Sequence, residues 1–339
     1  MTVKYYVGLD IHMRRTSICI LNANGKTVKT QNVRGRMDKV LKVLRRIKGP
    51  WSAALEASCG YGVWNDALRK LGADVTVAHP AKIAAIARSK TKNDRNDAEL
   101  LARMLMLDML PTVHVPSVEV RAWRELITHR ESLVKKRTRL KQQIRALLRG
   151  QGITAPKSLW AKKTRPWFRE LPLAQRAHRA KLDSQLRQLD LIEEELRYAT
   201  RELNAIAAGH PAVMLLRTIP GVGPRTAESV AAWIDQPERF RNSKCVSAYF
   251  GLVPCQDASG SRNRLGHITR NGPSHVRRLL TEAVWQGIRR SPKICAYYER
   301  IRRDDPERRK IAVVATMHYL VRVMHGMLRS GELWREDAA

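Results

Sequence analysis

Residues 5–33 read YYVGLDIHMRRTSICILNANGKTVKTQNV, and this stretch indicates the fold class of the N-terminal part of the chain. Tyr5–Asp10 and Thr16–Leu21 are short apolar runs joined by a basic turn. Lys26–Val33 alternates between apolar and polar residues, which is typical of a half-buried strand. The stretch therefore predicts three consecutive β-strands.

The following residues alternate between helical and strand patterns. Helical spacing occurs at Val40–Ile47 and Val63–Leu71, buried-strand patterns occur at Trp51–Glu56 and Val75–Ala78, and more helix follows Pro80. The order β-β-β-α-β-α-β-α predicts an α/β domain on a mixed sheet over residues 1–115.

From Ser117 onward the sequence pattern predicts longer helices. Leucines recur every seven residues in two series: Leu126, Leu133, Leu140 and Leu147, then Leu182, Leu189, Leu196 and Leu203. Residues 116–209 are therefore predicted to form a helical hairpin or a dimerising coiled coil, and the coiled coil is preferred to ordinary bundle helices. Residues 210–339 are predicted as a mainly α domain with one irregular Gly-rich stretch, Gly251–Gly272.

The net charge points to a polyanionic partner. The 339 residues include 63 Lys and Arg against 31 Asp and Glu, a formal charge of +32. Residues 1–115 hold 20 basic and 9 acidic residues, residues 116–209 hold 21 and 10, and residues 210–339 hold 22 and 12. Because the excess is spread over the whole chain, nucleic acid is the expected partner. An anionic membrane and a generic basic surface are the alternatives.

No membrane association is expected. No apolar run approaches the roughly 20 residues of a membrane span, and the opening residues, MTVK, do not resemble a signal peptide. The expected location is the cytoplasm of a bacterium or archaeon, in association with the nucleoid. The five cysteines are odd in number and form no C-x-x-C pair, so we expect reduced and mostly buried thiols.

Four carboxylates in the first domain suggest a metal site. Asp10 and Glu56 each end a predicted strand, and Asp94 and Asp97 lie on one face of a predicted helix start. Four carboxylates close together in a basic domain need a cation, and oxygen ligands suit Mg²⁺. Each residue alone has a simpler explanation, such as helix capping by Asp94 and Asp97. Taken as a set, they predict a two-metal phosphoryl-transfer site.

This set resembles the D-E-D-D carboxylates of RuvC-like, RNase H-fold nucleases, and the whole chain resembles the DEDD insertion-sequence transposases, the IS one-ten family, with the related Piv-type DNA invertases. The resemblance implies a RuvC-like domain, a coiled-coil linker and a C-terminal transposase domain. Near the start of the last domain, Ile219–Ala227 resembles a helix-hairpin-helix turn, in which Gly221, Gly223 and Arg225 would approach a phosphate. An ordinary interhelical turn is an equal alternative.

The C-terminal domain also follows the family's serine-domain pattern in four successive stretches: Tyr249–Pro254, Ser259–Ser261, Gly266–Gly272 and Arg277–Leu280. The resemblance implies that Ser259 is the nucleophile that becomes joined to a DNA strand end. Ser261 stays a second candidate, because it stands where the family more often has glycine. Arg262, Arg264 and Arg270 are predicted to hold phosphate oxygens.

The resemblance further implies one composite active site, in which metal ions activate the serine or the phosphate. It implies donor and target DNA as substrates, a noncoding bridge RNA that selects them by base pairing, and dimers that assemble into tetramers on DNA. The leucine repeats would offer a surface for that assembly.

Two other functions are compatible with parts of the sequence. A Holliday-junction resolvase or structure-specific nuclease would use the carboxylates alone to direct water. A non-catalytic nucleic-acid-binding protein would need neither the carboxylates nor the serine. The presence of both motifs favours the recombinase.

Overall fold

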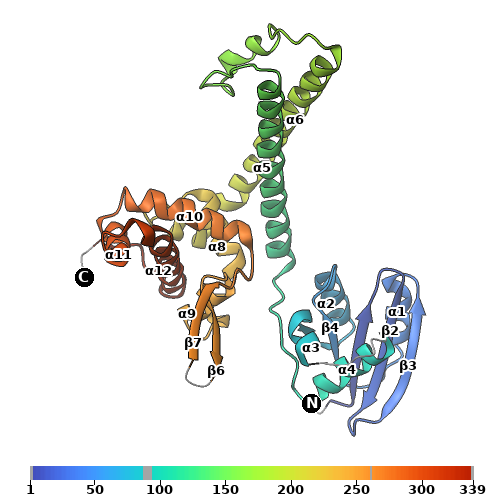
Figure 1. Ribbon diagram of the computed structural model, residues 1–339. Helices are drawn as coiled ribbons and strands as arrows, with labels where there is room; N and C mark the ends of the chain where they lie inside the picture. The colour runs from blue at the N-terminus through green and yellow to red at the C-terminus, as the bar shows by residue number, and fades with distance from the viewer. Residues whose placement is uncertain (1–2, 87–93, 260–261, 337–339) are drawn as a thin grey trace. The chain divides into compact units, whose positions relative to one another are not determined.

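A computed structural model describes residues 3–86, 94–259 and 262–336, and gives only the backbone for residues 85, 94, 95, 257–259, 262 and 263. The chain forms two compact units, Met1–Val118 and Glu119–Ala339 (Figure 1). Each unit has its own hydrophobic core.

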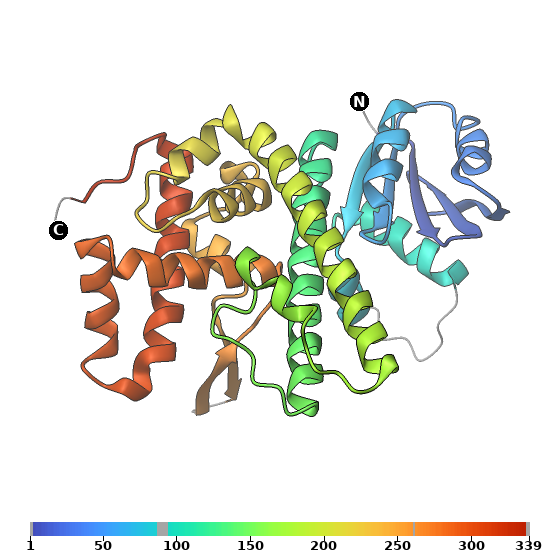
Figure 2. The same ribbon diagram turned by 90° about the horizontal axis from the view of Figure 1, so that it is seen from above.

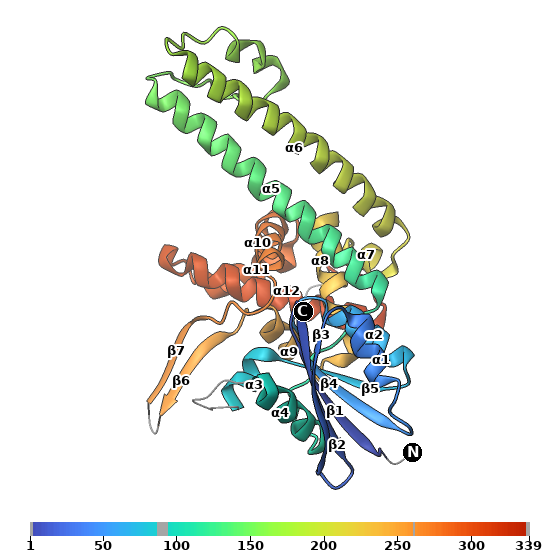
Figure 3. The same cartoon turned by 90° about the vertical axis from the view of Figure 1, so that its right-hand side faces the viewer.

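The first unit is built on a five-stranded mixed sheet (Figure 3). The strands are β1 (Tyr5–Ile11), β2 (Arg15–Asn22), β3 (Thr27–Arg34), β4 (Trp51–Glu56) and β5 (Asp74–Ala78). Their spatial order is β3-β2-β1-β4-β5. Strand β2 runs antiparallel to both β1 and β3, whereas β4 runs parallel to both β1 and β5. The predicted mixed sheet and the order of its elements are confirmed.

Helices cover both faces of this sheet. Helices α1 (Met37–Leu44) and α2 (Tyr61–Lys70) pack on the face that carries Val7, Leu9 and Leu55. Helices α3 (Pro80–Ile86) and α4 (Asp94–Met106) pack on the opposite face, where Ala98 and Leu101 of α4 join separate small clusters with strand residues. Because side chains alternate along a strand, neighbouring strand residues belong to different cores.

Gly8 allows α4 to lie directly on β1. A Cβ atom at Gly8 would stand 1.9 Å from the carbonyl oxygen of Ala98 and 2.7 Å from the amide nitrogen of Ala102. Any side chain here would push the helix away from the strand. Gly8 therefore sets the position of the helix that carries Asp97.

We predict that Gly8→Ala destabilises the first unit by about 1–3 kcal/mol or more, because the clash is with backbone that cannot move aside as a side chain can. Urea denaturation followed by circular dichroism measures the loss. Gly326→Ala in the second unit is the control, because a Cβ at Gly326 meets open space and the change should be neutral or stabilising. Equal stability of the Gly8 variant and the wild type would contradict the close packing of α4 on β1.

The second unit begins with two long helices, α5 (Val118–Gly150) and α6 (Arg176–Ala208), which form an antiparallel hairpin (Figure 2). Leu140 shares a core cluster with Leu189, and Leu133 shares one with Leu196. An ion pair of 3.1 Å joins Lys141 on α5 to Glu193 on α6. Residues later in α5 contact residues earlier in α6, so the two helices run antiparallel.

The leucine repeats are therefore used within the chain. Seven of the eight repeat leucines are at most 8% exposed, and Leu126 packs partly buried beside them. The expectation that these leucines offer a surface for dimerisation is wrong, because the second helix of the same chain already covers them. The helical-hairpin alternative is the correct one.

The remaining named helices and strands of the second unit follow α6 along the chain. They are α7 (Pro211–Leu216), α8 (Pro224–Ile234), α9 (Ser243–Tyr249), β6 (Pro254–Ser259), β7 (Arg262–Ile268), α10 (Ser274–Ile288), α11 (Pro292–Arg302) and α12 (Arg309–Ser330). Trp123 of α5 and Leu203 of α6 belong to the same core cluster as Leu280 and Leu320. The packing thus joins residues 116–209 to residues 210–339 in one compact unit. The division of the chain into three functional domains stays a prediction.

Two expectations need correction here. The stretch Pro306–Ser330 is, by length and composition alone, apolar enough to cross a membrane, which differs from the expectation that no apolar run approaches that length. Its residues Met317, Leu320 and Met324 are buried in the unit's core, which accounts for the apolar composition. The five cysteines are free as expected, but only Cys19 is buried.

The prediction that the Gly-rich stretch Gly251–Gly272 is irregular is wrong. Most of the stretch forms the antiparallel hairpin β6–β7. Ser259 pairs with Arg262, and Gly260-Ser261 separates these two residues in the sequence. A Gly-Ser pair between two strand-length segments is a known hairpin signal. The two strands lack alternating apolar residues, so the sequence pattern did not predict this hairpin.

Candidate active site and nucleic-acid interface

Asp10 and Glu56 lie side by side on neighbouring parallel strands, Asp10 one residue before the end of β1 and Glu56 at the end of β4. Leu9 pairs with Leu55 in the register of β1 and β4, so Asp10 and Glu56 occupy the next position on each strand. Leu9 and Leu55 belong to the core on the α1–α2 face. Because alternation places the next residue on the opposite face, both carboxylates face the α4 side of the sheet.

Asp97 on α4 is close enough to influence Asp10. Burial, the largest effect, raises the pKa of the Asp10 carboxyl, and the charge of Asp97 raises it further. His12 opposes these effects, with its Nε2 atom 3.0 Å from an Asp10 oxygen, and Arg15 also lowers the pKa. A half-buried carboxyl beside a second one is an environment in which a cation would be stabilising.

The predicted cluster of four carboxylates stays a prediction, because the residues that the structure describes do not include the side chain of Asp94. Within those residues, no group of three His, Cys, Asp or Glu side chains stands ready to hold a metal ion. Asp94 begins α4 as expected, but its side chain lies outside the described residues. The structure thus brings Asp10, Glu56 and Asp97 to one face. His12 is a further neighbour of Asp10 on this side of the sheet.

Ser259 is the last residue of β6, at the tip of the β6–β7 hairpin. Its side chain and the side chain of Arg262 lie outside the described residues, as does Ser261 altogether. Arg264 is exposed on β7, and Arg270 follows the hairpin with φ of +56°, an uncommon conformation for a residue with a side chain. The serine candidate thus sits on a projecting arm with two arginines along its second strand.

The base of this arm is held closed by Arg277 of α10. Its Nη1 atom donates hydrogen bonds to the carbonyl oxygens of Phe250, Asn271 and Gly272, at either end of the arm. Gly251 permits the close approach, since a Cβ there would stand 2.3 Å from the amide nitrogen of Asn271. Arg277 therefore ties the two ends of the arm to the helical body.

The predicted helix-hairpin-helix turn lies between α7 and α8. Gly221 has φ of +88°, and a Cβ there would stand 2.4 Å from the amide nitrogen of Gly287 on α10. Gly221 is thus required for packing, as the structural alternative supposed. Gly223 is the N-cap of α8 and has open space around it, which leaves its backbone accessible to a ligand.

This turn forms one wall of a large basic cavity. The cavity has a volume of about 810 Å³ and is bounded by α5, by the turn and start of α8, and by α10. Its cationic residues come from all three walls: Arg130, Lys135, Arg137, Arg139, Arg225 and Arg278. Glu131 and Glu282 are the acidic residues on the same walls.

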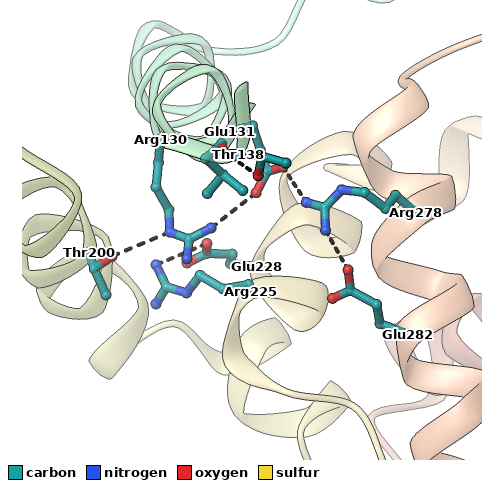
Figure 4. Close-up of polar contacts among 9 residues, drawn as sticks. Arg130, Glu131, Thr138, Thr200, Arg225, Glu228, Arg278 and Glu282 are labelled. Atoms are coloured by element: carbon teal, nitrogen blue, oxygen red, sulfur yellow. Dashed lines mark hydrogen bonds and ion pairs between the residues drawn. The ribbon is translucent and has the colours of Figure 1, made fainter. Parts of the chain in front are cut away.

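Charged side chains link the walls of the cavity. Glu131 of α5 pairs with Arg130 at 3.0 Å and with Arg278 of α10 (Figure 4). Arg225 pairs with Glu228 at 3.1 Å, and Glu228 is only 1% exposed. Because its burial outweighs the attraction of Arg225, the pKa of Glu228 is raised to about 7. Burial likewise lowers the pKa of Arg225. For both residues, the cost of removing the charge from water therefore exceeds the attraction between the two charges.

Comparison with known proteins identifies the family. Residues 7–152 match a family model described as a transposase, of the DEDD type of IS110 elements, and residues 213–299 match the transposase IS116/IS110/IS902 family. This chain belongs to that family of transposases. It is an enzyme of DNA strand cleavage and transfer.

Several curated transposases resemble the chain over most of its length. The transposase for insertion sequence element IS1111A of Coxiella burnetii is 29% identical over 81% of this chain and 75% of its own length. The transposase for insertion sequence element IS1328 of Yersinia enterocolitica is 26% identical over 82% of both chains. A probable family 20 transposase of Pseudomonas aeruginosa is 28% identical over 73% of both.

The matched segments contain the candidate residues of this transposase. Asp10, Glu56, Asp94 and Asp97 lie in the first segment, and Ser259 lies in the second. The DEDD family implies dependence on a divalent metal. Sequence reasoning had missed the acidic and basic cavity residues of α5, because nothing local in a charged helix distinguishes Arg130 and Glu131 from solvated residues.

We predict that Glu228 makes the transposase less stable as pH rises. Its folded-state pKa of about 7 lies above its ordinary value, so its favourable contribution is complete below about pH 4.5 and is lost as pH rises through about 7. The loss is at most about 3 kcal/mol. Urea denaturation between pH 5 and 8 should show this slope in the wild type and a smaller one in Glu228→Gln. Glu282→Gln, at an exposed position, should keep the wild-type slope, and an identical slope in all three would refute the assignment.

Proposed function

We propose that this transposase cuts and rejoins DNA through Ser259, with divalent cations, Mg²⁺ in particular, held by Asp10, Glu56, Asp94 and Asp97. The first unit would be an RNase H-like, RuvC-like domain. Its strand order β3-β2-β1-β4-β5, with three antiparallel strands followed by two parallel ones, agrees with that assignment. A bridge RNA, donor and target DNA, and a homo-oligomer on DNA complete the proposal, and the cytoplasm would be its location.

The packing of α4 on β1 at Gly8 is the observation that carries the metal site. It brings Asp97 to the face of the sheet on which Asp10 and Glu56 lie. All three donors offer carboxylate oxygens, which Mg²⁺ prefers. A bound cation would stabilise charge on the reacting phosphate and lower the pKa of an attacking hydroxyl.

The β6–β7 arm supports the serine step. Ser259 pairs with Arg262 in the backbone register of the two strands, and Arg264 follows two residues later on β7. In the proposed step the Ser259 oxygen forms a bond to phosphorus, the bond from phosphorus to one sugar oxygen breaks, and that oxygen takes up a proton. Attack by another strand's hydroxyl would reverse the step, return the proton to the serine and leave DNA rejoined without net hydrolysis.

The basic cavity and the overall charge support a nucleic-acid interface that includes Gly221, Gly223 and Arg225. Contacts to phosphates give affinity without reading sequence. Selection of sites by a base-paired RNA would leave the protein to hold backbone and shape alone.

The experiment that tests the proposal is a covalent-capture assay. Purified transposase is incubated with the noncoding RNA of its element, Mg²⁺ and labelled DNA that carries the element junction, and the products are separated on denaturing gels. A protein–DNA adduct that requires both a serine and the carboxylates supports the proposal. Cleavage with no adduct would instead indicate a resolvase-type nuclease, and binding with no cleavage under any condition would indicate a non-catalytic nucleic-acid-binding protein.

A further inference from the structure

Another pocket lies between α10 and α12. It has a volume of about 570 Å³. Helix α10 lines it with Arg277, Arg278, Thr281 and Trp285, which recur at helical spacing on one face, and α12 lines it with Arg309, Lys310, Val313, Val314 and Met317. Ile268 and Arg270, at the root of the β6–β7 arm, line it as well. We name it the α10–α12 groove.

The groove combines an apolar floor with a cationic rim. Val313 is 7% exposed and Met317 is 3% exposed, and the sulfur of Met317 lies 3.4 Å from the hydroxyl oxygen of Thr281. Arg270, Arg309 and Lys310 are exposed at the rim. Of the described residues that line the groove, none is acidic. An occupant must therefore be anionic in one part and apolar or aromatic in another.

Two of the lining arginines are already committed to the fold. Arg277 donates to the carbonyl oxygens at the base of the arm, and Arg278 pairs with Glu131 and Glu282. Arg309 lies over the ring of Trp285, with its guanidinium carbon 4.8 Å from the ring centroid. A planar group that enters the groove would find an aromatic ring, a guanidinium plane and aliphatic side chains, which are the surfaces on which nucleobases stack.

We propose that the α10–α12 groove holds one nucleotide of a DNA strand, with its phosphates at Arg270, Arg309 and Lys310 and its base against Trp285 and Val314. The proposal rests on the proposed function in taking DNA as the occupant. It adds a binding site beyond the carboxylates, the serine and the basic cavity, and it shares only Arg278 with that cavity among the described residues.

The groove lies at a defined separation along the arm from Ser259. Strand β7 runs six residues from Arg262, the partner of Ser259, to Ile268 at the groove, which corresponds to about 20 Å at roughly 3.4 Å per residue. A B-form strand covers that length in about six nucleotides, since it rises 3.4 Å per nucleotide. The bound nucleotide therefore flanks the cut site and is not the reacting one.

Fluorescence anisotropy without Mg²⁺ or RNA tests the groove alone. The probes are a labelled 12-residue oligothymidylate and an abasic 12-residue strand with the same number of phosphates. The wild type should bind the strand with bases about tenfold more tightly, because stacking adds to the phosphate contacts. Val314→Glu should lose this preference, since the half-buried position places a carboxylate on the floor. Ile311→Glu is the matched control on the same helix, 57% exposed and outside the groove.

A second variant pair tests the rim. Arg309→Gln combined with Lys310→Gln should reduce the salt dependence of oligothymidylate binding by about 1.4 in log–log slope, since each lost phosphate contact on a single strand accounts for about 0.7. Arg289→Gln combined with Arg290→Gln removes the same charge from exposed positions outside the groove and should change the slope by less.

Photocrosslinking locates the base. An oligonucleotide with 5-iododeoxyuridine should crosslink to the peptide that contains Trp285 in the wild type and lose that crosslink in Val314→Glu. Equal binding of both strands, or a crosslink elsewhere that Val314→Glu leaves unchanged, would overturn the proposal. Competition by a polyglutamate peptide as effective as oligothymidylate would also overturn it, in favour of a general anion site. Because no cleavage is read, failure of the serine mechanism leaves these results unaffected.

Discussion

Replacing Ser259 by alanine is expected to abolish the covalent protein–DNA adduct and to lower the rate of strand transfer by about 10³-fold or more, whereas Ser261→Ala is expected to keep the adduct. The hydroxyl oxygen of the nucleophile forms the bond to phosphorus, so no neighbouring group replaces it. Losses of this size are typical when an enzyme's covalent nucleophile is removed. Denaturing gels of the junction DNA, and mass spectrometry of the adducted peptide, measure the result.

The interpretation depends on intact DNA binding. Ser259 lies at the tip of an arm, away from the clamp that Arg277 makes at its base, so Ser259→Ala should keep the wild-type affinity for junction DNA within about twofold. An adduct that persists in Ser259→Ala and disappears in Ser261→Ala would move the nucleophile to Ser261. Cleavage without any adduct in the wild type would remove the serine from the mechanism and leave water directed by the carboxylates.

The first unit could be predicted from sequence because its signals are local. Apolar alternation and strand-length runs gave the three leading strands, and a carboxylate at the end of an apolar run placed Asp10 and Glu56 at the edge of the sheet. The importance of Gly8 was not predictable, because its partner Ala98 lies 90 residues later in the chain. A close approach between distant segments leaves no periodic pattern in either of them.

The second unit shows what periodicity leaves open. Leucines at seven-residue spacing predict a helix with an apolar face, but they do not say whether the chain or a second copy covers it; here Leu189 of α6 covers Leu140 of α5. The basic cavity was likewise invisible, because Arg130, Arg225 and Arg278 are brought together only by tertiary packing. The β6–β7 arm lacks an apolar face, so alternation could not reveal it.

Asp10→Asn is expected to stabilise the protein in the absence of divalent cations and to abolish both its stabilisation by Mg²⁺ and its DNA cleavage. Burial and the nearby charge of Asp97 disfavour the ionised Asp10 carboxyl, so a neutral side chain of the same shape removes a cost. The same charge is what a cation would bind. In the wild type, Mg²⁺ at 100 times its dissociation constant would stabilise the fold by about 2.7 kcal/mol. Thermal unfolding with and without Mg²⁺ measures both effects.

Asp74→Asn is the matched control, because Asp74 is an exposed aspartate at the start of β5 in the same unit. It should keep both the stabilisation by Mg²⁺ and the cleavage activity. Glu56→Gln should behave like Asp10→Asn, since the two residues occupy adjacent positions on the α4 face. If Mg²⁺ stabilises Asp10→Asn and Glu56→Gln as much as the wild type, the ion is held elsewhere. The raised pKa of Asp10 would then reflect the burial of a strand end, and the carboxylates at this edge of the sheet would have no part in metal binding.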